Sequence, residues 1–438
     1  MYFYNKLLER LILPAADTVI GSRFYSELVN MRAVGLAECD YTDKLKKLLI
    51  HATEKTVYYK KYKSDIDNPY QWLSLFPILE KSDIVRHSSD LVYDANRKLI
   101  INSSSGSTGE QTTIFWSEFE QALNRATQVL WWEWAGFRLG DPVLQTGINP
   151  RRSPVKKVKD LLLNTCYLQA FTHSKNEVID ALRWASRKNN PVLAGYASSL
   201  YVIACIAEES GIELSFKTAI SWGDKLFHHY RKKIESVFST KVFETYGSGE
   251  GLMIAAQYDL DRMYIMTPNV YIEIVDDKGN AVPDGTLGHV IVTNLNGYSM
   301  PLIRYRIGDL AIKMPAEAYP KNRLLSLPIL EKVIGRDTDI VKTRSGKYMV
   351  VHSFTGIFEH IPQIRQFCVI QENLDGIVIN FIKGDGFTED CLEMIRNKII
   401  NNLGELFEVK FRSVDFIAPT KSGKPQLIIS KLATNVQG

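Results

Sequence analysis

Between residues 143 and 244, short apolar stretches alternate with segments of helical spacing, and few folds can accommodate such an alternation. The apolar stretches are residues 143–145, 192–193, 217–221 and 242–244, and the helical segments are residues 178–187, 200–209 and 227–238. When strands and helices follow one another in this way, the helices cover the faces of a sheet. The pattern therefore predicts an α/β fold with a mostly parallel sheet.

The pattern changes after residue 270. Short alternating strands at residues 271–275 and 289–293 are separated by turn residues such as Gly279 and Asn280, which predicts an antiparallel region. Beyond residue 336, strand and helix patterns at 367–371, 377–382 and 388–402 predict a compact α+β domain of about a hundred residues. We therefore expect a large N-terminal domain over residues 1–336 and a small C-terminal domain over residues 340–438.

Composition excludes several classes of protein. Apolar residues make up 45% and charged residues 23% of 438 residues, which is typical of a globular chain. The net charge of +4 comes without a long run of like charge, so we expect no nucleic-acid partner. The five cysteines form no Cys-x2-Cys pair, which favours reduced thiols in the cytoplasm and no zinc site.

Charged residues interrupt the apolar residues of segment 1–20, so neither a secretory leader nor a membrane-spanning helix fits. We expect a cytoplasmic protein without integral membrane association. The apolar face of this segment is predicted to pack on the protein's own core, with a membrane surface or a partner as the alternative.

The first chemical motif follows the apolar run 99–102. It is a loop of small and hydroxyl-bearing residues: Ser104, Ser105, Gly106, Ser107, Thr108 and Gly109. Backbone N–H groups and hydroxyls in such a loop can donate hydrogen bonds to phosphate oxygens. It is not a loop of the GxxxxGK[ST] type, because Glu110 follows the second glycine. A purely structural serine-rich loop is an equal alternative.

A second motif, residues 246–251, directly follows the apolar stretch 242–244. Tyr246 offers a ring that can cover adenine, and Gly247 lets the backbone approach a nucleotide. Glu250 can hold Mg²⁺ through a carboxylate oxygen. The alternative of a dinucleotide-binding loop is disfavoured, because the glycines have the spacing G-x-G-x-G.

Three further motifs lie toward the C-terminus. The segment 304–309 ends in Asp309, whose carboxylate can accept both ribose hydroxyls, although the segment taken alone favours a surface salt-bridge cluster. The segment 335–339 contains Arg336 and Asp339 at the expected domain boundary. The segment 420–424 ends in Lys424, a cation on a glycine-flanked loop.

Taken in order, the five motifs resemble the adenylate-forming superfamily of acyl-CoA synthetases, adenylation domains and luciferases. The resemblance runs from about residue 103 to residue 424. Residues 298–309, with the sequence YSMPLIRYRIGD, are similar to the phenylacetate-CoA ligase branch, which includes CapK-like proteins encoded with capsular polysaccharide genes. The resemblance implies a large domain of mixed sheets and helices followed by a small, mobile α+β domain.

The resemblance also implies roles for individual residues. The loop 104–109 would hold the phosphates, Tyr246 would stack on adenine beside Gly247, and Asp309 would anchor the ribose. The catalytic residues implied are Glu250 as the Mg²⁺ ligand, Arg336 near the ribose and phosphates, and Lys424, which would stabilise charge on the α-phosphate. Asp339 would be the hinge.

By this resemblance the chain is an ATP- and Mg²⁺-dependent enzyme that forms an acyl-adenylate, releases pyrophosphate and passes the acyl group to an acceptor. Coenzyme A is the expected acceptor. An amine or hydroxyl, such as that of an amino sugar in surface polysaccharide biosynthesis, is the alternative. A non-catalytic nucleotide-binding protein is the second alternative, because Glu110 and Gly249 replace a usual lysine and threonine.

Other departures bear on the acid and on metals. Trp222 begins a segment where this branch commonly has a Gly-Glu or Gly-Ala-Glu turn, so we place Trp222 and Tyr196 in a candidate acyl pocket. Gln257 and Tyr264 occupy the region where some relatives carry zinc ligands, which again predicts no zinc.

Overall fold

The computed structural model describes residues 2–21, 23–35, 40–93, 98–104, 112–148, 157, 160–171, 174–336, 340–345, 347–358, 361–418 and 427–432. The chain divides into two compact units. The first contains the described residues up to Ile307 together with Ala311–Lys332, and the second contains Gly308–Leu310 together with the described residues from Val333 onward. The domain bounds given above, 1–336 and 340–438, stay a prediction.

The largest sheet has eleven strands in the order β10-β11-β12-β13-β9-β8-β7-β6-β5-β3-β4. These strands are β3 (Val143–Gly147), β4 (Thr165–Gln169), β5 (Val192–Tyr196), β6 (Thr218–Trp222), β7 (Val242–Gly247), β8 (Met253–Gln257), β9 (Met263–Ile265), β10 (Val270–Val275), β11 (Leu287–Asn294), β12 (Tyr305–Lys313) and β13 (Ile329–Arg336). Strands β4, β3, β5, β6 and β7 pair in parallel, as predicted. The predicted antiparallel region is confirmed for β10 and β11.

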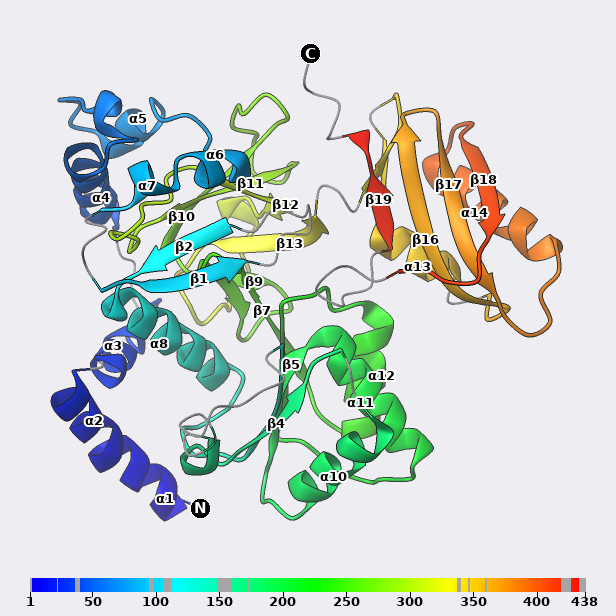
Figure 1. Cartoon of the computed structure of the whole chain (residues 1–438), viewed down its shortest axis with the longest axis horizontal. Coiled ribbons are helices and arrows are strands. Elements are labelled where there is room, and N and C mark those ends of the chain that lie inside the picture. Colours follow the sequence, from blue (N-terminus) through cyan, green and yellow to red (C-terminus); the bar gives the residue numbers. More distant parts are fainter. Residues whose placement is uncertain are drawn as a thin grey trace. The chain divides into compact units, whose positions relative to one another are not determined.

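Helices cover both faces of the parallel strands (Figure 1). On one face, α10 (Lys175–Ser186), α11 (Ala197–Glu209) and α12 (His228–Phe238) share a core with Leu193 of β5. On the other face, α3 (Phe24–Met31) and α8 (Glu118–Trp134) share a core with Val192 and Ala194. Successive residues of a strand point to opposite faces, so Leu193 is buried in one core and Val192 and Ala194 in the other. This burial on both faces explains why β5 is a continuous apolar run in the sequence.

The N-terminal part of the chain contains α1 (Tyr2–Leu7), a π-helix (Leu8–Ile12), α2 (Leu13–Ile20), α4 (Thr42–Lys55), a 3₁₀ turn (Lys60–Tyr62), α5 (Pro69–Leu73), α6 (Lys81–Arg86) and α7 (Ser88–Leu91). A β-hairpin follows, with β1 (Ile100–Ser104) antiparallel to β2 (Thr112–Trp116). Within the described residues, none of the helices is both long enough and apolar enough to cross a bilayer.

The second unit contains a four-stranded sheet in the order β18-β17-β16-β19. The elements of this unit are β14 (Ile340–Lys342), β15 (Tyr348–Val350), α13 (Val351–Phe358), β16 (Ile364–Asn373), β17 (Gly376–Lys383), α14 (Asp390–Leu403), β18 (Glu408–Ser413) and β19 (Ile428–Ser430). The first unit also contains a 3₁₀ turn at Ala316–Ala318. Helix α14 buries Cys391, Ile395, Ile399 and Leu403, a four-residue repeat that marks one helical face. The predicted α+β character of this part is confirmed.

Candidate functional site

The carboxyl ends of the parallel strands meet at one edge of the sheet. Ligands of open α/β sheets bind at this edge, outside the strand ends. Strand β5 ends at Tyr196 and β6 ends at Trp222, both of which we predicted for the acyl pocket. Gly223 follows with a φ of +80°, and a Cβ atom at this position would lie 2.4 Å from Cε1 of Tyr196. The ring of Tyr196 therefore packs directly on this glycine.

Asp224 fixes the turn that follows β6. Its carboxylate accepts hydrogen bonds from the backbone N–H groups of Ala197, at 2.6 Å, and Ser198, at 3.1 Å. The hydroxyl of Ser198 also donates to it. These N–H groups open the first turn of α11, where no intrahelical acceptor exists. Asp224 thereby ties the end of β6 to the start of α11.

Aromatic rings line this part of the edge. Phe171 and Tyr196 have ring centroids 4.8 Å apart, and Tyr196 lies 6.4 Å from Trp222. Trp222 stacks on Trp132 of α8 at 5.7 Å, and Trp132 meets Phe137 edge-on at 5.4 Å. We call these five residues the aromatic wall. Burial first, and then the nearby Asp224 carboxylate, raises the pKa of Tyr196 to about 12, so its phenol is neutral at pH 7.

The turn after β7 carries the second motif. Tyr246 is the fifth residue of β7 and is 9% exposed. Gly247 follows, and a Cβ atom there would lie 2.6 Å from the carbonyl oxygen of Leu252. The N–H of Ser248 donates to that same carbonyl at 3.0 Å, which closes the turn. The hydroxyl of Ser248 is buried and, among the described residues, has no hydrogen-bond partner.

Glu250 lies at the tip of this turn and is 8% exposed. Its Oε1 accepts hydrogen bonds from the hydroxyl of Tyr305, at 3.3 Å, and from Oγ1 of Thr112, at 3.5 Å. Thr112 opens β2, immediately beyond residues 105–111, and Tyr305 lies in the segment 304–309. The turn, the hairpin and β12 thus contribute side chains to one buried carboxylate.

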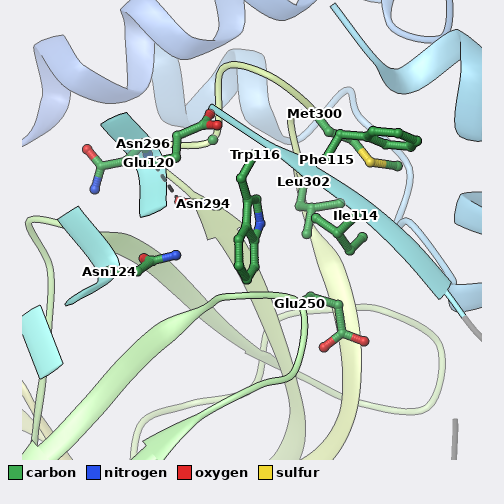
Figure 2. A pocket seen from close by; sticks show the side chains of 11 residues that line it. Ile114, Phe115, Trp116, Glu120, Asn124, Glu250, Asn294, Asn296, Met300 and Leu302 are labelled. Carbon is green, nitrogen blue, oxygen red and sulfur yellow. Dashed lines mark hydrogen bonds between the residues drawn. The ribbon is translucent and has the colours of Figure 1, made fainter. Parts of the chain in front are cut away.

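A narrow pocket lies beside Glu250 (Figure 2). Figure 2 shows Trp116 extending into it, with Asn124 on one side and Glu250 on the other. Its lining comes from β2, α8, the turn after β7, the end of β11 and the segment that follows: Ile114, Phe115, Trp116, Glu120, Asn124, Glu250, Asn294, Asn296, Gly297, Met300 and Leu302. The pocket therefore contains two carboxylates and three side-chain amides.

Glu120, the second carboxylate, has a structural role. Its Oε2 accepts from the N–H of Ser117, at 2.6 Å, as half of a reciprocal cap at the start of α8. Its Oε1 accepts from the N–H of Ser299, at 2.8 Å. Glu120 therefore holds α8 to the segment after β11, whereas the hydrogen bonds to Glu250 come from side-chain hydroxyls.

Gly251 is required by the packing of Trp116. Its φ is +82°, and a Cβ atom would lie 2.3 Å from Cζ2 of the indole. We expect Gly251→Ala to lower thermal stability and to lower any acid-dependent activity by more than tenfold, because the ring or the Glu250 turn must shift. Gly136→Ala is the matched control, because Gly136 has a φ of +93° with open space around it. Equal losses of activity in the two variants would contradict this prediction.

Asp309 of β12 forms an ion pair with Arg336 of β13 at 3.3 Å. The side chain of Asp309 is 13% exposed, whereas that of Arg336 is 46% exposed. In the same segment, Arg304 pairs with Glu273 at 3.0 Å and Arg306 with Glu80 at 2.9 Å. The two arginines therefore tie the start of β12 to Glu273 and Glu80. Asp309 itself lies beside Arg336, the second predicted site residue of this region.

Most residues of the predicted phosphate loop, the hinge and the C-terminal lysine lie outside the described residues. Ser104 ends β1 and pairs with Thr112 of β2. The rest of the predicted phosphate loop, Ser105, Gly106, Ser107, Thr108 and Gly109, lies outside the described residues, as do Glu110, Asp339 and Lys424. Their roles stay predictions.

The donor set at Glu250 fits a magnesium ion in part. A buried carboxylate oxygen is the ligand type that Mg²⁺ prefers, and Mg²⁺ commonly takes its remaining ligands from phosphate and water. Within the described part of the chain, no cluster of three or more His, Cys, Asp or Glu side chains could hold a metal by itself. In the region predicted to lack zinc ligands, the side-chain oxygen of Gln257 accepts from the N–H of Glu244 at 2.9 Å, and the hydroxyl of Tyr264 donates to Asp259 at 2.8 Å.

Sequence reasoning missed four residues of the site: Thr112, Trp116, Asn124 and Tyr305. Tyr305 lies inside the motif 304–309, in which only Asp309 was predicted as a site residue. Thr112 and Trp116 follow the phosphate loop by a few residues in a strand-like run, which was the available signal. Asn124 is one residue of a long helix, and only the fold brings it beside Trp116.

Comparisons with known proteins bear on the identity of the chain. Residues 340–431 match the family described as the CapK C-terminal domain. Protein CapK of Staphylococcus aureus is 23% identical over 371 residues, which cover 82% of this chain and 80% of CapK. Phenylacetate-coenzyme A ligase of Pseudomonas putida is 29% identical over 182 residues, which cover 39% of this chain and 38% of that enzyme.

Among solved structures, 2-hydroxyisobutyryl-CoA ligase in the postadenylation state, in complex with R3-HIB-AMP, superimposes with a TM-score of 0.68. The match covers 90% of this chain and 89% of that one, at 18% sequence identity. The resemblance and the fold class predicted from the sequence are thereby confirmed.

Proposed function

We propose that this chain, which is similar in sequence to CapK and phenylacetate-coenzyme A ligase and has the fold of an acyl-CoA ligase, activates a carboxylic acid with ATP and transfers the acyl group to coenzyme A. In the first step, a carboxylate oxygen attacks the α-phosphorus, the bond to the β-phosphate oxygen breaks, and pyrophosphate leaves. In the second step, the acceptor thiol attacks the acyl carbonyl carbon, AMP leaves with the electrons of the broken C–O bond, and the thiol proton passes to solvent.

One observation carries the proposal: the Glu250 carboxylate joins two of the sequence motifs to the strand that follows a third. Thr112 follows the phosphate loop, Glu250 lies in the second motif, and Tyr305 lies in the third. The two hydroxyl donors to Oε1 hold the orientation of the Glu250 carboxylate. Magnesium, when bound, would neutralise phosphate charge, and Glu250 would supply a ligand to it.

The residues of this chain would also place the two reactants. Tyr246 supplies a ring next to the turn for adenine, and Asp309 supplies a carboxylate for the ribose hydroxyls. The aromatic wall, at the ends of β5 and β6, offers a surface for the acyl group. Holding ATP and the carboxylate of the acid in one geometry supplies a large part of the acceleration that such an enzyme needs.

A second acceptor class deserves a test, because the C-terminal residues match the CapK C-terminal domain. The similarity to phenylacetate-coenzyme A ligase covers 39% of the chain, whereas the similarity to CapK covers 82%. By the resemblance, the small domain takes part in acyl transfer. A small domain of the CapK type is therefore compatible with an amine or hydroxyl acceptor, such as an amino sugar, in place of coenzyme A.

The test is ATP–pyrophosphate exchange with a panel of aryl, short-chain, hydroxy and amino acids, in the presence of Mg²⁺. Exchange that depends on one class of acid is the expected result, because only adenylate formation returns labelled pyrophosphate to ATP. Coenzyme A and amino sugars are then added separately, and AMP release is measured. Exchange with no acid, although ATP binds, would overturn the proposal and favour the non-catalytic alternative.

A further inference from the structure

The two stacked indoles of the aromatic wall differ in their surroundings from an ordinary core. Trp222 is the last residue of β6, and Trp132 lies in the last turn of α8, with their ring planes 15° apart. Trp222 also reaches Tyr196 at the end of β5. The stack therefore extends from the core to the strand ends where ligands of open α/β sheets bind.

The indole N–H of Trp132 is buried and, within the described part of the chain, has no hydrogen-bond partner. The whole side chain is close to fully covered, since the residue is 9% exposed. Buried tryptophan N–H groups are normally paired, because an unpaired donor destabilises the folded state. A phenylalanine at this position could also stack on Trp222, and it would bury no unpaired N–H donor.

We propose that the acid activated at this site carries a neutral hydrogen-bond acceptor, a hydroxyl or carbonyl oxygen, which receives the N–H of Trp132. The inference rests on the proposed function and names the class of acid that it uses. The hydrocarbon part of the acid packs on the aromatic wall beside Trp222. A second carboxylate is a poorer fit, because none of the five wall residues carries a positive charge to pair with it.

The neighbouring residue Trp131 supplies a matched control. It is 2% exposed, and its indole N–H likewise lacks a partner among the residues that the structure describes. Successive residues of an α-helix point about 100° apart, however, and the ring that stacks on Trp222 is that of Trp132. The same substitution at both positions removes the same donor, but only one of the two donors belongs to the aromatic wall.

The experiment measures exchange with pairs of acids that differ only in a neutral acceptor, such as 4-hydroxyphenylacetate against phenylacetate and 3-hydroxybutyrate against butyrate. The unmodified protein is expected to prefer the acceptor-bearing acid of at least one pair by roughly tenfold in kcat/KM. Trp132→Phe should reduce that ratio to near one, and Trp131→Phe should leave it unchanged. A ratio within one variant is insensitive to a general loss of folded protein, which melting curves of both variants also monitor.

The outcomes separate this inference from the function beneath it. Exchange with an unchanged ratio in Trp132→Phe, or a preference for the unsubstituted acid in every pair, would overturn the inference alone. No exchange with any acid in the unmodified protein would overturn the proposed function and this inference with it.

Discussion

Lys424→Ala is expected to lower acid-dependent ATP–pyrophosphate exchange by roughly 100-fold or more. The resemblance implies that the Lys424 ammonium would lie near the α-phosphate and the attacking carboxylate, where negative charge accumulates in the transition state. An alanine leaves that charge without its cation. The measurement is the initial rate of exchange at saturating ATP and acid, with ATP binding measured separately.

The specificity of this loss can be checked in two ways. Lys421→Ala removes a cation three residues earlier in the sequence and should change exchange by less than about threefold, because the resemblance implies no role for Lys421 at the α-phosphate. Transfer from preformed acyl-adenylate should also largely survive in Lys424→Ala, because the resemblance implies that this lysine matters for adenylate formation and much less for transfer. Equal losses in Lys421→Ala, or equal losses in both half-reactions, would contradict the assigned role.

Glu250→Gln is expected to raise the Mg²⁺ concentration needed for half-maximal exchange by roughly 100-fold. The amide oxygen of glutamine can still accept from Tyr305 and Thr112, so the turn keeps its hydrogen bonds. The charge that makes the carboxylate a good Mg²⁺ ligand is lost. The measurement is a Mg²⁺ titration of exchange at fixed ATP, with melting curves of the same preparation.

Glu120→Gln is the matched control, since it neutralises the other buried carboxylate of the same pocket. Glu120 accepts from the backbone of Ser117 and Ser299, so its substitution should lower the free energy of unfolding by about 1 kcal/mol. The Mg²⁺ requirement should not change. A Glu250→Gln variant that loses stability but keeps the normal Mg²⁺ requirement would refute the metal-ligand role.

The repeating α/β region could be predicted from the sequence because its signals are local. Strand β6 was expected at residues 217–221 and is Thr218–Trp222, and the helix expected at residues 200–209 is α11, Ala197–Glu209. Apolar strands buried on both faces and helices with one apolar face each leave a pattern that neighbours in the chain reveal.

Where the pattern continued past the element, the prediction was too long. Lys, Leu, Ala and Glu at helical spacing from residue 38 to about residue 62 predict one surface helix, but α4 ends at Lys55. The next residue, Thr56, has an extended backbone, with φ −113° and ψ 145°. Its hydroxyl donates to the carbonyl of Ala52 at 2.8 Å, which terminates the helix.

The contacts of the site could be predicted only in part. Glu250 was chosen because its motif has a recognisable sequence, but its partners Thr112 and Tyr305 lie far from it in the chain. Such pairings are made by the order of strands in the sheet and by the hairpin, which no local pattern encodes. The same holds for Trp132 and Trp222, which are separated by 90 positions and meet only because α8 packs against β6.

Asp224 has a consequence for where a nucleotide can bind. Many doubly wound α/β proteins seat a phosphate at a helix N-terminus beside the strand ends, where free N–H groups and the helix dipole attract anions. At α11 a carboxylate from the chain itself already occupies that position. The start of this helix is electrostatically satisfied before any substrate arrives. We therefore expect phosphate binding at the predicted serine-rich loop that follows β1 in the sequence, and we expect the strand ends beside α11 to receive the uncharged part of the acid.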